Sequence, residues 1–205
     1  PSYRIGILGN LFSRIGSSAM PMLIPLLLQV GLGLGPMNAG LMMVPVAAAG
    51  MVSKKLAVKL VERYGYRRVL MTNTVLVGLA MASFILMTPG QHLAVRLLQL
   101  AFFGAVNSLQ FTVMNTVTLR DLDREFASSG NSLLSMVMML AAGFGAAAAG
   151  SLLAAFGTQL EGHGATAALH ATFLCVGAIT LTSTLIFWQL PDTKPEPRQV
   201  EEVAE

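Results

Sequence analysis

Residues 132–156 read SLLSMVMMLAAGFGAAAAGSLLAAF, a run with no charged side chain anywhere along it. An α-helix rises about 1.5 Å per residue, so roughly 20 apolar residues cross the ~30 Å hydrocarbon core of a bilayer. The run is therefore long enough to cross a membrane as a helix. Its composition predicts a transmembrane span.

Five further apolar stretches flank this run. The chain of 205 residues is 54% hydrophobic and 11% charged, whereas a soluble domain carries about 25% charged residues. The last segment, 191–205, is rich in prolines and acidic residues, which predicts a disordered cytoplasmic tail. We therefore expect an all-α membrane protein, with one six-helix transmembrane bundle over 1–190. The predicted spans are 5–32, 38–61, 69–87, 93–118, 132–156 and 168–190.

Lysine and arginine concentrate in alternate gaps between these spans. Of the thirteen, eleven fall near the two ends of the chain and in the gaps around 54–68 and 120–124. Such loops stay on the cytoplasmic side of a membrane. We expect a multi-pass protein of the bacterial inner (plasma) membrane, with both termini of this segment cytoplasmic. Because the chain starts with Pro1, at a charged edge, we also expect it to be the C-terminal portion of something longer.

The most specific motif is VKLVERYGYRR at 58–68, between the second and third spans. It resembles the loop signature of the major facilitator superfamily, Gly-x-Leu-Ala-Asp-Arg-x-Gly-Arg-Arg, with Glu in place of the Asp. The resemblance implies the C-terminal half-bundle of a major facilitator transporter, in which this loop takes part in gating. The expected gating residues are Leu60, Glu62, Arg63, Gly65, Arg67 and Arg68.

Other segments strengthen the resemblance. The stretches 28–33, 39–43, 114–116 and 127–132 look like the 14-helix drug:proton antiporter group of that superfamily. The likeness implies two six-helix bundles around a central cavity, and export of lipophilic drugs in exchange for protons by alternating access. The implied partners are the lipid bilayer, an N-terminal transporter half, a small-molecule substrate and protons.

Arg14 is the most informative single residue. It lies about ten residues inside the first span, so ~15 Å deep, where an arginine costs ~2.5–3.5 kcal/mol on insertion scales. No acidic residue of the chain lies at a matching depth. We expect its counter-charge on the substrate or in the N-terminal half, with a structural arginine bonded to backbone carbonyls or water as the alternative. Gln29 is a lesser cavity candidate near the outer end of the same span.

The fourth span carries the richest polar face. Residues three and four apart lie on one side of a helix, which groups Asn107 with Gln110 and Met114, and Asn115 with Ser108 and Thr112. Such side chains either bond across helices or line a cavity. We expect Asn107, Gln110, Met114 and Asn115 to line the cavity.

Other function classes find less support in the sequence. No Gly-x-Ser-x-Gly, His-Glu-x-x-His or phosphate-binding glycine loop is present, and the histidine spacing matches no metal motif. We expect no enzyme activity, no cofactor, no metal and no nucleic-acid partner. Transport of an organic anion or a sugar, and a homodimeric six-helix assembly protein, remain alternatives. Because no span contains an acid, a proton carrier would have to lie outside these residues.

Overall fold

The structure is a computed structural model that describes residues 2–120, 127–160 and 165–189. All regular elements in those residues are helices, and six are long and apolar enough to cross a membrane. The prediction of an all-α, six-span membrane protein is confirmed. The predicted tail at 191–205 and the acidic residues at 121–125 and at 161 lie outside the described residues. The elements are α1 (Ser2–Leu26), η1 (Leu27–Gly31), α2 (Pro36–Met42), α3 (Val44–Tyr64), α4 (Tyr66–Ser83), η2 (Phe84–Leu86), α5 (Leu93–Arg120), α6 (Ala127–Gln159) and α7 (Ala165–Phe187).

Prolines shape the first two spans. Pro21 and Pro25 lie inside α1 and lack the N–H that an α-helix needs, and α1 continues as the π-helical turn η1 directly after them. The predicted second span, 38–61, consists of two helices, because the helix is interrupted at Met43. Pro45 then sits in the first turn of α3, where a missing N–H costs nothing.

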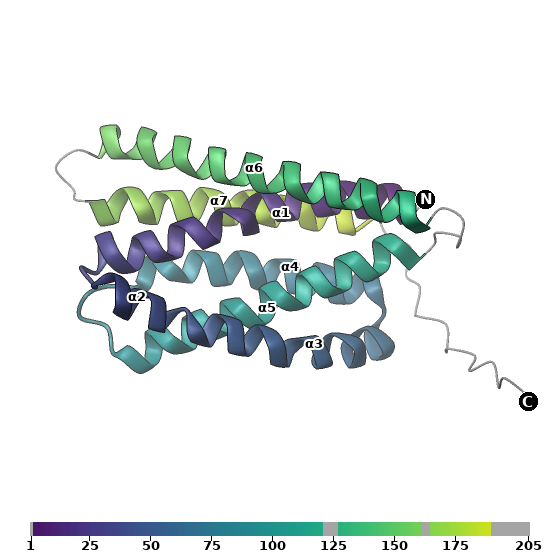
Figure 1. Ribbon diagram of the computed structural model, residues 1–205, viewed down its shortest axis with the longest axis horizontal. Helices are drawn as coiled ribbons and strands as arrows, with labels where there is room; N and C mark the ends of the chain where they lie inside the picture. Colours follow the sequence, from purple (N-terminus) through teal and green to yellow (C-terminus); the bar gives the residue numbers. More distant parts are fainter. Residues whose placement is uncertain (1, 121–126, 161–164, 190–205) are drawn as a thin grey trace, which may run out of the picture.

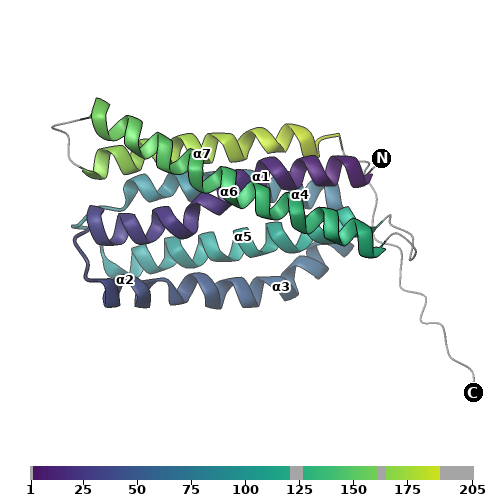
Figure 2. The same ribbon diagram turned by 45° about the horizontal axis from the view of Figure 1, so that its top comes forward.

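The helices run along the long axis of the molecule (Figure 1). α1 is central and packs against α5, α6 and α7, whereas α3 packs mainly on α5, and α4 packs between α5 and α7. In Figure 1, α6 runs along the top edge of the bundle and α3 along the bottom edge, and Figure 2 shows α6 crossing the front of the bundle at an angle. The start of α1, the α3–α4 turn, the end of α5 and the start of α6 share one end of the bundle.

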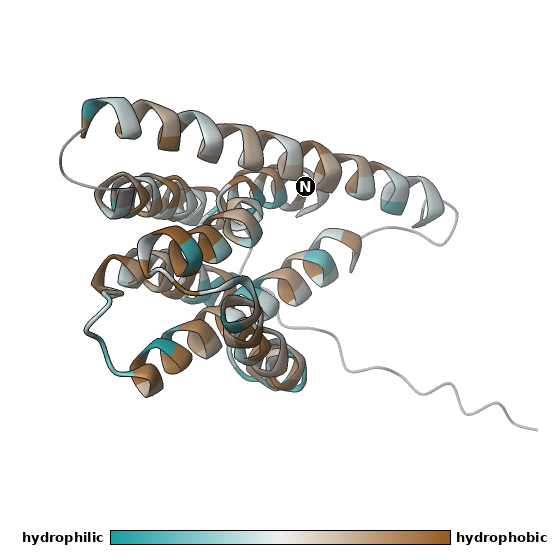
Figure 3. Ribbon diagram, turned by 60° about the vertical axis from the view of Figure 1, so that its left-hand side comes forward, coloured by the Kyte–Doolittle hydropathy of each residue, from teal (hydrophilic) through white to brown (hydrophobic). Residues whose placement is uncertain are grey.

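Two hydrophobic clusters fill the bundle, one toward each end. The larger surrounds Phe84, whose ring lies 5.3 Å from that of Phe173 and 5.7 Å from that of Phe103, measured between centroids. The smaller surrounds Leu70 and Phe187. Hydrophobic residues recur along all the helices (Figure 3), and many large apolar side chains are exposed, as lipid contact requires.

Glycines allow two helix pairs to approach closely. A Cβ on Gly104 of α5 would overlap the backbone carbonyl of Val46 in α3, and one on Gly145 of α6 would overlap the carbonyl of Ile15 in α1. Within lipid, packing replaces the hydrophobic drive between helices, and small residues make that packing possible. The α3–α5 contact, which forms one wall of the candidate site, therefore depends on Gly104.

Replacing Gly104 with alanine should loosen this contact. The new methyl group would meet backbone, which cannot move aside as a side chain can, so we expect a loss of ~1–3 kcal/mol and a lower unfolding temperature in detergent. Gly90→Ala, in the exposed turn before α5, is the control, since no neighbouring atom lies within 4 Å of its Cβ position. Equal unfolding temperatures for the two variants would contradict the role assigned to Gly104.

Candidate functional site

Arg14 lies midway along α1 and is only 7% exposed. Its Nε donates to Asn10 Oδ1 at 2.9 Å, and its Nη2 donates to Asn115 Oδ1 of α5 at 3.0 Å. Both acceptors are neutral amides. The only carboxylate among the described residues is Glu62, which is exposed near the end of α3. The charge of Arg14 is therefore solvated by amides and has no ion-pair partner within the described part of the chain.

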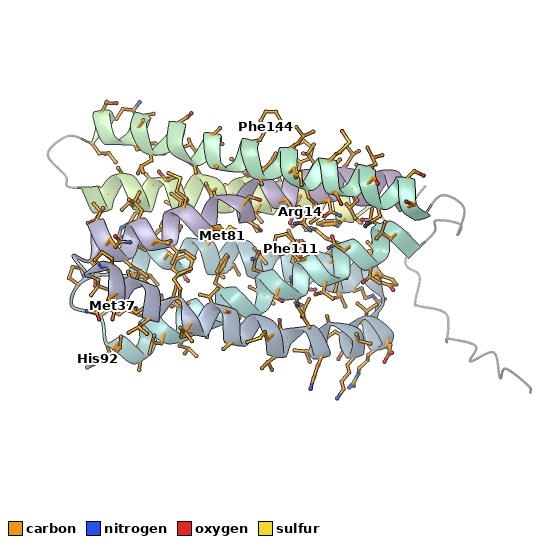
Figure 4. The ribbon with its side chains drawn as sticks, viewed as in Figure 1. Arg14, Met37, Met81, His92, Phe111 and Phe144 are labelled. Carbon is orange, nitrogen blue, oxygen red and sulfur yellow. The ribbon has the colours of Figure 1, made fainter. Side chains whose placement is uncertain are left out.

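An aromatic ring completes the surroundings of the guanidinium. Cζ of Arg14 lies 4.0 Å from the centroid of the Phe111 ring, and the two residues lie side by side near the middle of the bundle (Figure 4). A cation over a ring in a desolvated place gains ~2 kcal/mol. Asn10 is held in turn, because its Nδ2 donates to Thr118 Oγ1 at 3.0 Å. The position of the guanidinium is thus set by α1 and α5 together.

A second polar group joins three helices beside Arg14. Gln110 of α5 is 1% exposed; its Nε2 donates to Thr74 Oγ1 at 2.7 Å and to Ser13 Oγ at 3.4 Å, and its Oε1 accepts from Asn73 Nδ2 at 2.7 Å. Asn73 also donates to the Val106 carbonyl. Water is absent from lipid, so a buried amide must find partners within the protein. The Gln110 network links α1, α4 and α5.

A cavity of about 460 Å³ lies between α3 and α5. Its wall is mixed: Lys54 supplies a charge, Asn107 and Asn115 supply amides, and Phe111 supplies an aromatic face. Asn107 Oδ1 is buried and accepts no hydrogen bond among the described residues. The other lining residues are Val46, Ala47, Gly50, Met51, Gly104, Ser108 and Thr112.

The predicted cavity residues separate into three groups. Asn107 and Asn115 line the cavity, and Arg14 lies directly behind Asn115 and Phe111. Gln110 and Met114 face the interior instead, where Met114 is 1% exposed. Gln29 is exposed in η1, near the outer turn. The polar face of α5 is therefore divided between a cavity and a helix–helix contact.

Several residues of the site were not among the candidates predicted from the sequence. Asn10 carried a usable signal, since it lies four residues before Arg14 and so on the same side of the helix. Lys54 was counted only among the basic residues around 54–68, yet it lines the cavity. Asn73 and Thr74 were not singled out at all. Nothing in their local sequence shows that they meet Gln110, which lies on another helix.

The gating motif forms a sharp turn between two helices. α3 ends at Tyr64 and α4 begins at Tyr66, so Gly65 alone makes the turn, with φ of 82°. That conformation suits glycine and few other residues. Tyr66 is buried and anchors the turn. The remaining motif side chains lie around it: Leu60 and Arg67 are half-buried, and Glu62, Arg63 and Arg68 are exposed.

The described residues offer little for a metal. No group of three or more His, Cys, Asp or Glu side chains lies together in that part of the chain. The polar atoms of the cavity are amides, hydroxyls and one ammonium group, which suit an organic molecule better than a hard cation. The arrangement can hold, by hydrogen bonds and stacking, a small molecule with an apolar body.

Comparison with known proteins adds two findings. Residues 6–205 match the sequence profile of the Major Facilitator Superfamily. Over 197 residues the chain is 43% identical to proteins named "Putative multidrug resistance protein MdtD" from Salmonella paratyphi B, Salmonella newport and Salmonella typhi. Each alignment covers 94% of this chain and 42% of the relative. The chain thus spans less than half the length of these curated relatives.

Removing the Gln110 amide should destabilise the bundle. In Gln110→Leu, the Asn73 and Thr74 side chains lose a partner in a place that water does not reach, and we expect a cost of ~1–3 kcal/mol. The measurement is the unfolding temperature in detergent. Thr116→Val, on an exposed position of the same helix, is the control and should change it little. An unchanged temperature for Gln110→Leu would show that the network adds no stability.

Proposed function

This chain belongs to the major facilitator superfamily, as its loop motif predicted, and we propose that it forms the C-terminal half of a secondary active transporter. The transporter exports lipophilic drugs or other small molecules by proton antiport with alternating access. The family and the six spans make the chain a multi-pass membrane protein of a transport family. The direction, the coupling ion and the substrate are the parts that we propose.

The observation that carries the proposal is a buried, unpaired cation beside a polar cavity. Charged residues within membrane spans are rare, and they mark substrate and ion pathways. Arg14 lies in the middle of the bundle, and both of its α5 contacts, Phe111 and Asn115, line the cavity. A helix contact alone would not require a charge at this depth. A cavity that takes up a solute can use such a charge to attract it.

Two helices have surfaces that suit a partner half. In the spans Pro36–Tyr64 and Ser128–Gln159, only 22% of the apolar 18-residue stretch is buried inside the bundle. The corresponding share in Ile7–Gly31 is 56%. On α6, nothing lies within 4 Å of a Cβ built at Gly143, Gly150 or Gly157. Glycines spaced by seven residues allow a neighbouring helix to approach closely. We assign these outer faces to the N-terminal half and to lipid.

The basic end of the bundle is assigned to the cytoplasm of a bacterium, with the protein in its inner membrane. The α3–α4 turn and the start of α1 lie at this end, and lysine and arginine favour the cytoplasmic side. The turn at Gly65 then lies where cytoplasmic ends of helices separate and meet during alternating access. Arg67 and Arg68 are the residues we expect to make and break contacts there.

Proton coupling needs a titrating acid or histidine inside the membrane, and the two such groups in the described spans, Glu62 and His170, lie near span ends. Glu62 is exposed, and it is the only carboxylate among the described residues. Proton relays in transporters use acids or histidines inside the membrane. We therefore assign the proton carrier to another part of the transporter, most simply the N-terminal half. Arg14 then serves the substrate and does not carry the proton.

Efflux from energised cells that express the full-length gene tests the proposal. Cells are loaded with fluorescent dyes of positive, zero or negative charge, ethidium being the cation, and efflux is followed with and without a protonophore. We expect protonophore-sensitive efflux of at least one dye, reduced more than about tenfold by Arg14→Ala at equal membrane expression. Absence of efflux for every dye, despite normal expression, would contradict drug export.

Replacing Arg67 and Arg68 together with alanine tests the gating role. If these side chains act between conformations, the variant should bind substrate with nearly unchanged affinity and transport it several-fold more slowly. The measurements are initial efflux rate and substrate affinity in the same preparation. Lys55→Ala, an exposed change on the neighbouring helix, is the control. A rate equal to that of the control would remove the gating role.

A further inference from the structure

We propose that the cavity between α3 and α5 selects amphipathic anions, molecules with an apolar or aromatic body and a carboxylate or similar negative group. The proposal rests on the transport function above and deepens it by naming the substrate class. It differs from what the group resemblance alone suggests, which is lipophilic drugs of any charge. Three features of the molecule support it: the charges around the cavity, the hydrogen bonds of Arg14 and the side chains of the cavity wall.

The charges that the described residues place around the cavity are positive, with Lys54 exposed and Arg14 buried. Lys54 lines it, and Arg14 lies behind the Phe111 and Asn115 side chains of its wall. Glu62, the only described carboxylate, lies eight residues beyond Lys54 on α3, so ~12 Å further along the helix. A charge in a low-dielectric wall attracts opposite charge far more strongly than it does in water. This surface therefore favours an anion and disfavours a cation.

The hydrogen bonds of Arg14 leave its charge unneutralised. Nε and Nη2 donate to amide oxygens, which satisfy donors but carry no negative charge. Arg14 does not itself line the cavity, so a carboxylate bound there would act on this charge across the Phe111 and Asn115 side chains. A charge held without a carboxylate in a membrane is stabilised most by a ligand that supplies one.

The rest of the wall suits an apolar body with a polar edge. Val46, Ala47 and Met51 are apolar, and the ring of Phe111 can stack against an aromatic ligand. The unpaired Oδ1 of Asn107 can accept a hydrogen bond from the ligand. A volume of about 460 Å³ is within the range of small-molecule sites. The cavity can thus hold one compact aromatic molecule with a charged end.

Three pyrene probes that differ only in their end group test the proposal. They are 1-pyrenebutyrate, its neutral primary amide and the corresponding butylamine, which share one aromatic body. Binding to the purified full-length transporter in detergent is measured by fluorescence titration. We expect the carboxylate to bind at least about tenfold more tightly than the amide, and the amine to bind most weakly. Equal affinities for the three probes, or tightest binding of the amine, would overturn the proposal.

Variants then assign the preference to its residues. Arg14→Gln should remove the carboxylate preference while leaving amide binding within about twofold, and Arg14→Lys should keep part of it. Lys54→Gln should weaken carboxylate binding several-fold, whereas Lys55→Gln, its neighbour outside the cavity, should not. A preference that survives Arg14→Gln would overturn the role of Arg14. If gel filtration shows that Arg14→Gln does not fold, the probe ranking in the wild type still tests the proposal. The comparison of Lys54→Gln with Lys55→Gln tests it as well.

Transport in proteoliposomes separates this inference from the proposed function. Carboxylate binding that depends on Arg14, without proton-driven movement, would support anion selection and contradict antiport. Proton-driven movement of the amine or of ethidium, without carboxylate preference, would support antiport and contradict anion selection. In that second case Arg14 pairs with a carboxylate of another part of the transporter, and Arg14→Gln would reduce the transport of all probes alike.

Discussion

The structure depends on keeping one positive charge in the middle of a membrane-spanning bundle with no acid beside it among the described residues. Arg14 is held by two amide oxygens and one aromatic face, from Asn10, Asn115 and Phe111. Lipid supplies no hydrogen bonds and no water, so these groups must come from the protein. Their placement requires α1 and α5 to stay in register along this length. The rest of the bundle is arranged around that requirement.

The Gln110 network supplies the rigidity. It ties α4 to α5 and α1 through Asn73, Thr74 and Ser13, next to the layer that contains Arg14. The two hydrophobic clusters flank Gln110 along α5, with Val106 in one and Val113 in the other. α3 contributes differently, because it meets α5 at Gly104 and leaves a cavity along the same contact. One face of α5 therefore stabilises the bundle while another forms the wall of the site.

This division gives physical meaning to the polar residues of α5. An amide with all its partners inside the protein is a structural element, and Gln110 is of that kind. An amide with an unpaired atom at a cavity wall can exchange partners with a solute, and Asn107 is of that kind. A side-chain amide thus serves helix packing at Gln110 and, in our proposal, recognition at Asn107, three residues away. Burial and partner geometry distinguish the two uses.

The sequence by itself determined the number of spans and the family, because apolar length and the VKLVERYGYRR motif are local properties of the chain. It also identified Arg14, since a charge inside an apolar run stands out without any structure. Only the tertiary structure decided that Asn107 and Asn115 face the cavity while Gln110 and Met114 face the interior. The reason is that the helices packed against α5 differ around its circumference, with α3 on the cavity side and α1 and α4 on the other. Spacing along one helix cannot show which neighbour each side will meet.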